Sequence, residues 1–216
     1  MTFGVIFDMD GVLIDSNELI WKAINHAFKP YGCQLDRSEI NQLLGVSLRD
    51  NLLIWKKKFG VDIDLDNFRE QVDAFQFQNL TTVKADTHLL SLLLELKKNN
   101  VALGVGTSSS RNRAEKILTA LGIREYFPAI IGAEDVTEHK PHPHIFLATA
   151  EKLGMKPQWC VVIEDAKAGI EAAKRAQMKA IGIIHQYQQE DELKHADIII
   201  KDFSELSCRR IEALFK

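Results

Sequence analysis

Short apolar runs alternate with segments of helical period through the second half of the chain. Strands are predicted over 101–105, 129–131, 159–163, 180–184 and 197–200, and helices over 111–121, 143–153, 167–176 and about 204–215. Such alternation is typical of βαβ units on a parallel sheet. Gly122 and Gly154 directly follow two of the helical segments, where glycine commonly ends a helix. The pattern therefore predicts an α/β fold with a doubly wound parallel sheet, to which the apolar run 4–7 adds a strand.

Residues 16–81 follow a different rhythm, without any strand-like run. Their apolar positions trace three helical faces, namely Ile20, Ala23, Ile24, Ala27 and Phe28; Leu48, Leu52, Trp55 and Phe59; and Phe68, Val72 and Phe75. Asp15 and Asp36 each stand three residues before a glutamate, as in helix capping boxes. We expect a small all-helical cap at 16–81, inserted into an α/β core made of 1–15 and 82–216, with hinges near 12–15 and 81–86.

Acidic residues directly follow two predicted strands that are far apart in the chain. Asp8 and Asp10 follow the run 4–7, and Glu164 and Asp165 follow 159–163. Residues i and i+2 of a strand share a face, and the carboxyl ends of parallel strands lie on one edge of the sheet. Carboxylates that close repel one another unless a cation joins them. An all-oxygen set without a neighbouring cysteine favours Mg²⁺ over zinc.

Four segments resemble, in order, the motifs of the haloacid dehalogenase-like (HAD) hydrolases: 8–16, 106–109, 140–146 and 163–169. The similarity is to the phosphatase and β-phosphoglucomutase-like branch, in which a helical cap follows the first motif, and it covers essentially the whole chain. Four ordered motifs at strand ends are more specific than any one of them. The resemblance implies a HAD-like Rossmannoid core with a small helical cap.

The resemblance implies a chemical role for each matching residue. Asp8 would be the nucleophile that forms an aspartyl phosphate, and Asp10 the general acid and base. Thr107 would bind phosphate, and Lys140 would balance the charge of the transferring phosphoryl group. Mg²⁺ would be held by Asp8, the Asp10 carbonyl and Asp165, with Glu164 bound directly or through water. Phosphate or substrate contacts are expected from Gly11, Ser108, Ser109 and Arg49.

Histidines 139, 142 and 144 surround Lys140 and raise the question of a separate metal site. The intervening prolines impose an irregular backbone, and no cysteine or acid completes a set at ligand spacing. We therefore expect these histidines to frame the loop.

Two departures from the mutase pattern bear on the reaction. Where that pattern has a histidine and an arginine in the cap, this chain has Ile20 and Leu48; Arg49 is one residue off and could face either way. We expect a phosphatase acting on a small phosphorylated metabolite, such as a sugar phosphate or a phosphoglycolate-like compound, with a β-phosphoglucomutase-type phosphomutase as the alternative. A metal-free dehalogenase and a phospho-accepting signalling module fit less well, because neither needs Asp10.

Composition narrows the setting. The chain has 216 residues, 46% of them apolar, which is enough for one core with a small insertion. A net charge of −3 without a basic stripe argues against nucleic acid as a partner. The apolar run 89–94 is too short to span a bilayer, and no signal-peptide pattern opens the chain. Cys33, Cys160 and Cys208 fit reduced buried thiols. We expect a cytoplasmic monomer without a membrane partner.

Overall fold

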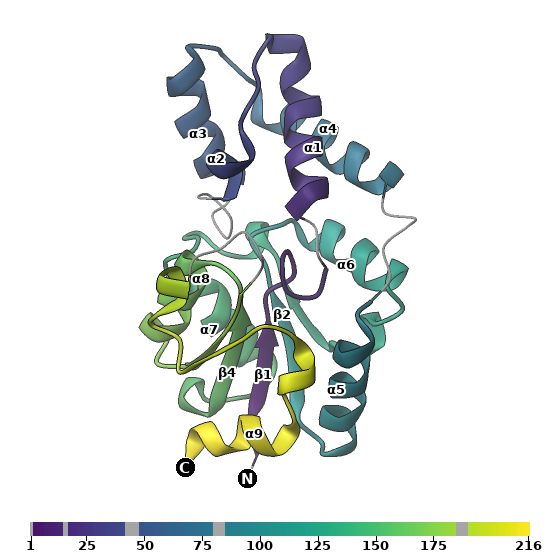
Figure 1. Cartoon of the computed structure of the whole chain (residues 1–216), viewed down its shortest axis with the longest axis vertical. Coiled ribbons are helices and arrows are strands. Elements are labelled where there is room, and N and C mark those ends of the chain that lie inside the picture. The colour runs from purple at the N-terminus through teal and green to yellow at the C-terminus, as the bar shows by residue number, and fades with distance from the viewer. Residues whose placement is uncertain (1, 15–16, 42–47, 80–84, 185–189) are drawn as a thin grey trace.

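A computed structural model describes residues 2–14, 17–41, 48–79, 85–184 and 190–216. These residues include a six-stranded sheet in the order β3-β2-β1-β4-β5-β6 (Figure 1). Its strands are β1 (Gly4–Phe7), β2 (Ala102–Gly106), β3 (Ala129–Ile131), β4 (Cys160–Glu164), β5 (Lys179–Ile183) and β6 (Ile198–Ile200). Every neighbouring pair is parallel. The predicted doubly wound parallel sheet is confirmed, with β1 at its centre.

Helices cover both faces of this sheet, because its buried side chains alternate between them. The side chains of Val5 and Phe7 pack in a cluster that includes residues of α5 (Thr87–Lys98), α6 (Arg111–Ala120) and α9 (Cys208–Glu212). The side chain of Ile6 lies in the opposite cluster, which includes residues of α7 (His144–Lys152) and α8 (Lys167–Arg175). Gly122 and Gly154 end α6 and α7 at φ angles of 69° and 68°. Strands buried on both faces explain why their sequences are nearly uniformly apolar.

The predicted last helix is broken. A 3-10 turn over Phe203–Glu205 comes first, Leu206 and Ser207 are extended, and α9 begins only afterwards. The Ser207 side chain accepts a hydrogen bond from the Arg210 amide and so starts a new helix. The spacing of the apolar residues predicts one continuous helix, but the cap at Ser207 starts a new helix within that span.

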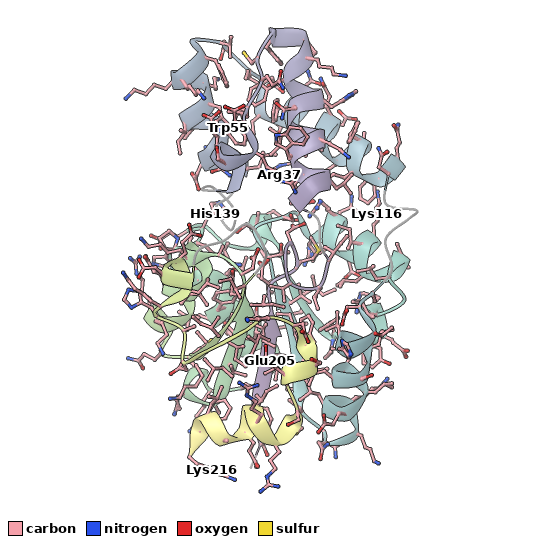
Figure 2. All side chains as sticks on the ribbon, viewed as in Figure 1. Arg37, Trp55, Lys116, His139, Glu205 and Lys216 are labelled. Atoms are coloured by element: carbon pink, nitrogen blue, oxygen red, sulfur yellow. The ribbon has the colours of Figure 1, made fainter. Side chains whose placement is uncertain are left out.

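Within its described residues, the cap segment forms helices and connecting turns and contains no strand. It contains α1 (Asn17–Phe28), α2 (Arg37–Asn41), α3 (Leu48–Phe59) and α4 (Leu65–Asn79), which lie together above the sheet (Figure 1). Its own hydrophobic cluster is centred on Phe28, whose ring lies 5.6 Å from Trp55 and 4.8 Å from Phe68 between centroids. Figure 2 shows Trp55 enclosed by these helices. Residues 15, 16 and 81–84 include the predicted cap boundaries and parts of the predicted hinges at 12–15 and 81–86. They lie outside the described residues, so the division at 16 and 81 stays a prediction.

The thiol prediction is only partly right. Cys160 is buried on β4, whereas the free thiols of Cys33 and Cys208 are partly exposed. Both of these lie where the chain enters or leaves a short helical turn near the surface, so neither is enclosed by the sheet layers. No helix in the described part of the chain is both long and apolar enough to cross a membrane.

Candidate active site

The carboxyl ends of β1 and β4 bring the two predicted acid pairs together. Phe7 is in register with Ile163, and the Asp8 amide continues the ladder by donating to the Ile163 carbonyl at 2.9 Å. Asp8, Glu164 and Asp165 are all almost fully buried. The parallel arrangement therefore places acids that are about 150 positions apart in one small volume, as the topology rule predicts.

Lys140 joins two of these acids. Its Nζ donates to Asp8 Oδ1 at 2.5 Å and to Glu164 Oε1 at 2.7 Å, and its side chain has no exposed surface. The ammonium group also lies 4.7 Å from the centre of the Phe146 ring. Lysine is rarely buried unless it is paired, so this position reflects the charge of its partners.

Glycines allow the acids to approach the backbone closely. Gly11, at φ +83°, lies so near Asp165 that a Cβ there would come within 1.9 Å of Oδ2, and a Cβ at Gly169 would come within 1.8 Å of Glu164 Oε1. The Gly11 amide donates to the Ile14 carbonyl at 2.8 Å, and the substrate contact predicted for Gly11 stays a prediction. These glycines shape the space around the carboxylates.

The site carries more buried negative charge than Lys140 balances. Burial raises the pKa of Asp8 to about 7 against the opposing effect of Lys140. Burial, followed by the charges of Glu164 and Asp8, raises the pKa of Asp165 well above its ordinary value. Although burial opposes its charge, Asp8 and Glu164 raise the pKa of Lys140. A divalent cation among these oxygens would relieve the repulsion, so the residues present fit Mg²⁺.

Asp10 is held by a residue that the sequence analysis did not single out. Arg113, in the first turn of α6, donates from Nη1 to Asp10 Oδ2 at 2.7 Å and from Nη2 to Oδ1 at 2.8 Å. The Ser109 hydroxyl donates to the same Oδ2 at 2.8 Å. Arg113 is 4% exposed, and its Nε donates to Gln76 Oε1 of the cap helix α4 at 2.5 Å. Asp73, also on α4, lies 3.9 Å from Nε.

Two signals in the sequence mark these missed residues. An arginine in the first turn of a helix opposes the helix dipole, which favours acids there. Gln76 stands four residues after Val72 on the apolar face of α4, and it is 2% exposed. A polar residue inside an apolar stripe needs a partner, and Arg113 supplies it.

The turn before α6 lies beside these groups. Thr107 is buried, and its Oγ1 accepts the Ser109 amide at 3.1 Å. Ser110 caps α6 by accepting the Arg113 amide at 3.3 Å. Ser108 lines the cleft described below, as does Ser109. Arg49 is exposed and is not among the residues that line the cleft, so the structure does not bring it to the other predicted site residues.

A cleft of about 820 Å³ of empty space, part of it open to solvent, separates the sheet edge from the cap. Asp8, Asp10 and Thr107 line it from the core. The cap contributes Ile20, Ile24, Leu48, Trp55 and Val72 as apolar residues, and Asn51, Arg69, Asp73 and Gln76 as polar ones. Arg69 of α4, which the sequence analysis did not single out, is a cationic residue on the cap side of the cleft.

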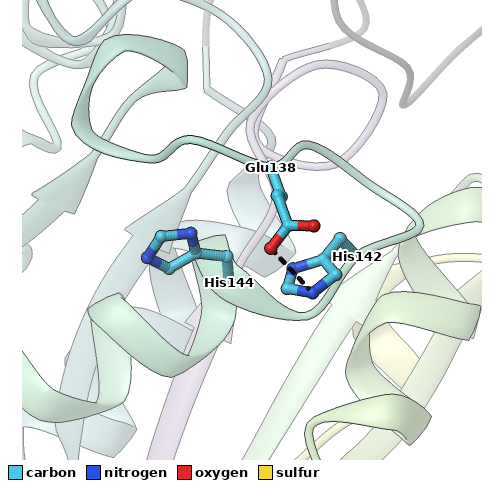
Figure 3. A group of neighbouring side chains, drawn as sticks. All are labelled: Glu138, His142 and His144. Atoms are coloured by element: carbon cyan, nitrogen blue, oxygen red, sulfur yellow. Dashed lines mark ion pairs between the residues drawn. The ribbon is translucent and has the colours of Figure 1, made fainter.

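The histidines near Lys140 have an acidic neighbour. Glu138 Oε2 lies 3.1 Å from His142 Nε2, and His144 lies close to both (Figure 3). The premise that no acid accompanies these histidines is therefore wrong, although His139 does not belong to the group. Glu138 is exposed and pairs with His142 whenever that imidazole is protonated, which explains their proximity without a metal.

Residues 5–183 match the profile of a family described as haloacid dehalogenase-like hydrolase. The fructose-1-phosphate phosphatase YqaB of Escherichia coli is 34% identical over 189 residues, covering 83% of this chain and 95% of that protein. The beta-phosphoglucomutase of Bacillus subtilis is 34% identical over 212 residues, covering 94% and 91%. The crystal structure of a beta-phosphoglucomutase from Clostridium difficile has a TM-score of 0.89 at 28% identity, covering 100% of this chain and 97% of that one.

Proposed function

Because the chain belongs to the haloacid dehalogenase-like hydrolases, we propose that it is a Mg²⁺-dependent phosphatase that hydrolyses a small phosphorylated metabolite such as a sugar phosphate. The family membership predicted from the four motifs is confirmed. The observation that carries the proposed activity is the buried contact of Lys140 with both Asp8 and Glu164. Asp165 lies beside them at the carboxyl ends of the strands. Buried acids around one lysine at a cleft suit the binding and transfer of a phosphoryl group.

In the first step, a carboxylate oxygen of Asp8 attacks phosphorus, and the bond from phosphorus to the substrate oxygen breaks. Lys140 balances the negative charge of Asp8 and of the phosphoryl group that arrives on it. Asp10, across the cleft mouth, donates its proton to the leaving oxygen. The products of this step are the free alcohol and an aspartyl phosphate.

In the second step, Asp10 accepts a proton from a water molecule while the water oxygen attacks the same phosphorus. The bond from phosphorus to Asp8 breaks, inorganic phosphate leaves and Asp10 is again protonated, so the cycle closes. Thr107 and Ser108, at the turn before α6, are placed to donate hydrogen bonds to the phosphoryl oxygens.

Asp8, Asp165 and the Asp10 carbonyl would hold Mg²⁺, which when bound supplies positive charge to the phosphoryl oxygens. Glu164 accepts from Lys140 with one oxygen and from the Ala166 amide at 2.7 Å with the other. Because both Glu164 oxygens are engaged in this way, we expect Glu164 to position Lys140 and not to bind Mg²⁺ directly.

The proposal is tested by measuring phosphate release from fructose 1-phosphate, glucose 1-phosphate, glycerol phosphate, phosphoglycolate and a nucleotide in the presence of Mg²⁺. We expect release from at least one sugar or polyol phosphate, abolition by a chelator, and no rescue by Ca²⁺, which takes more ligands at longer distances. Undiminished release in chelator would reject the proposed mechanism.

A phosphomutase is the second candidate, because two of the similar proteins are beta-phosphoglucomutases. Ile20 and Leu48 line the cleft at the positions where the mutase pattern has polar groups, which supports hydrolysis. With β-glucose 1-phosphate and a bisphosphate primer, parallel assays of free phosphate and glucose 6-phosphate separate the two reactions. We expect phosphate to form faster, and glucose 6-phosphate forming faster would establish the mutase instead.

A further inference from the structure

Arg113 occupies an unusual place for a positively charged residue. Its side chain is 5% exposed and belongs to the first turn of α6, yet it reaches the cleft mouth. Burying a guanidinium group is costly unless its donors are paired, and the helix dipole adds to that cost at this end. The contacts that offset the cost of burying this guanidinium therefore indicate the role of Arg113.

Those contacts join the core to the cap through the Arg113 side chain. Nη1 and Nη2 form a two-pronged contact with both Asp10 oxygens, Nη1 also donates to the Ser109 hydroxyl at 2.6 Å, and Nε donates to Gln76 of α4. A two-pronged pair sets the plane of a carboxylate as well as its position. The orientation of Asp10 thus depends on Arg113, and the orientation of Arg113 depends on a residue of the cap.

We propose that Arg113 is a positioning residue for Asp10, and that Gln76 couples this positioning to the seating of the cap over the cleft. The inference rests on the proposed function, in which Asp10 moves the proton in both steps. Proton transfer requires the carboxyl oxygen to lie within hydrogen-bond reach of the reacting oxygen. Because Gln76 of the cap helix α4 accepts a hydrogen bond from Arg113, the position of the Asp10 carboxyl group depends on how the cap lies over a bound substrate.

Two other roles for Arg113 are less consistent with its contacts. A residue that grips substrate phosphate presents most of its donors to the substrate, whereas four of the five N–H groups of Arg113 donate to protein acceptors. A purely structural ion pair would have no need to lie in the lining of the cleft with Asp10 and Gln76. The three roles predict different kinetics, so they can be separated.

The test uses Arg113→Met and Arg113→Lys, with Arg111→Met as the matched control. Arg111 lies on the same helix but pairs with Asp135 at 3.2 Å on the surface. With fructose 1-phosphate, we expect Arg113→Met to lower kcat by roughly 100-fold, the range of a mispositioned acid and base, and to change KM by less than about threefold. Arg113→Lys should recover only part of kcat, because an ammonium group cannot form the two-pronged contact. Arg111→Met should match wild type.

A second measurement follows the two steps separately. With p-nitrophenyl phosphate, whose leaving group needs no protonation, Arg113→Met should release a burst of about one nitrophenolate per active site and then turn over slowly, because water activation by Asp10 is impaired. Gln76→Leu should show the same pattern with a smaller loss, about three- to tenfold. Gln71→Leu, which removes an outward-facing glutamine of α4 that bonds Asn67, should show none.

The outcomes are distinct. If Arg113→Met raised KM at unchanged kcat, the arginine would grip substrate, and if it lowered only the melting temperature, it would be structural; either result overturns the inference. Wild-type kinetics for Gln76→Leu would reject the coupling to the cap. If Arg113→Met failed to fold, Arg113→Lys and Gln76→Leu would decide the matter. A wild-type protein without phosphatase activity would overturn the proposed function itself, a result that the variants do not affect.

Discussion

The sheet edge and the cap face each other across one cleft, but different forces organise them. At the edge, Asp8, Lys140, Glu164 and Asp165 are buried together, and their contacts are short and charged. In the cap, aromatic rings around Phe28 form the core, and a few polar side chains line the cleft. Charged groups that are buried at such cost depend on each other, whereas the cap core depends on the packing of its apolar side chains. On the proposed function, we therefore expect the chemistry to depend on the sheet edge and the selectivity for substrate to depend on the cap.

The largest effect is expected from Asp8→Asn. The amide has nearly the same shape as the carboxylate but is a far poorer nucleophile, so phosphate release should fall by at least about 1,000-fold. The fold should persist, because the change removes one charge from a crowded buried set. Steady-state phosphate release and thermal unfolding measure both effects. Asp191→Asn, at a side chain that is 79% exposed, is the control, and an active Asp8→Asn protein would contradict the covalent mechanism.

Lys140→Met should damage both stability and activity. Removing the lysine leaves Asp8 and Glu164 buried without their counter-charge, which typically costs about 3–5 kcal/mol. Urea unfolding in chelator should show this loss, and excess Mg²⁺ should reduce it by supplying charge to the same carboxylates. Lys152→Met, at an exposed position on α7, provides the comparison. Equal stabilities of the two variants would show that the edge does not depend on Lys140.

The cap should respond to loss of packing instead. Trp55 is 2% exposed and contacts Phe28 edge to face, so Trp55→Ala should lower the free energy of unfolding by about 3 kcal/mol. KM should rise as well, because Trp55 also lines the cleft. Ile54→Ala, at a neighbour that is 51% exposed, should cost less than about 0.5 kcal/mol. Urea unfolding of both variants checks the difference, and similar costs would mean that the cap core lies elsewhere.

The smallest effect concerns selectivity. Arg69 lines the cleft from the cap, where it could contact an anionic group at the far end of a substrate. Arg69→Leu should raise KM several-fold for glucose 1,6-bisphosphate while leaving that for glucose 1-phosphate unchanged, because only the former has a second phosphate. Arg49→Leu, at an exposed position outside the lining, should change neither. A change of KM in Arg49→Leu would instead support the substrate contact that the sequence predicted for Arg49.

The pattern of apolar residues along the chain predicted the secondary structure correctly where burial of those residues dominated the local structure. Strands buried on both faces are short apolar runs, so β1 to β6 were found within about one residue at most boundaries. The break before α9 was missed, because a single serine cap decided it against an apolar period. Arg113 and Gln76 were missed for a related reason: each contradicts the pattern of its own helix, and the partner that explains it lies on another element.

The sequence by itself determined the fold class and the convergence of Asp8 with Glu164 and Asp165, because periodicity marks the strands and the carboxyl ends of parallel strands share one edge of the sheet. Its four motifs also determined the family. Only the tertiary structure decided which cap residues face the cleft, that Arg49 does not, and that Arg113 holds Asp10. Those contacts depend on how each helix is rotated against the elements that it packs on, and no spacing rule within one segment specifies that rotation.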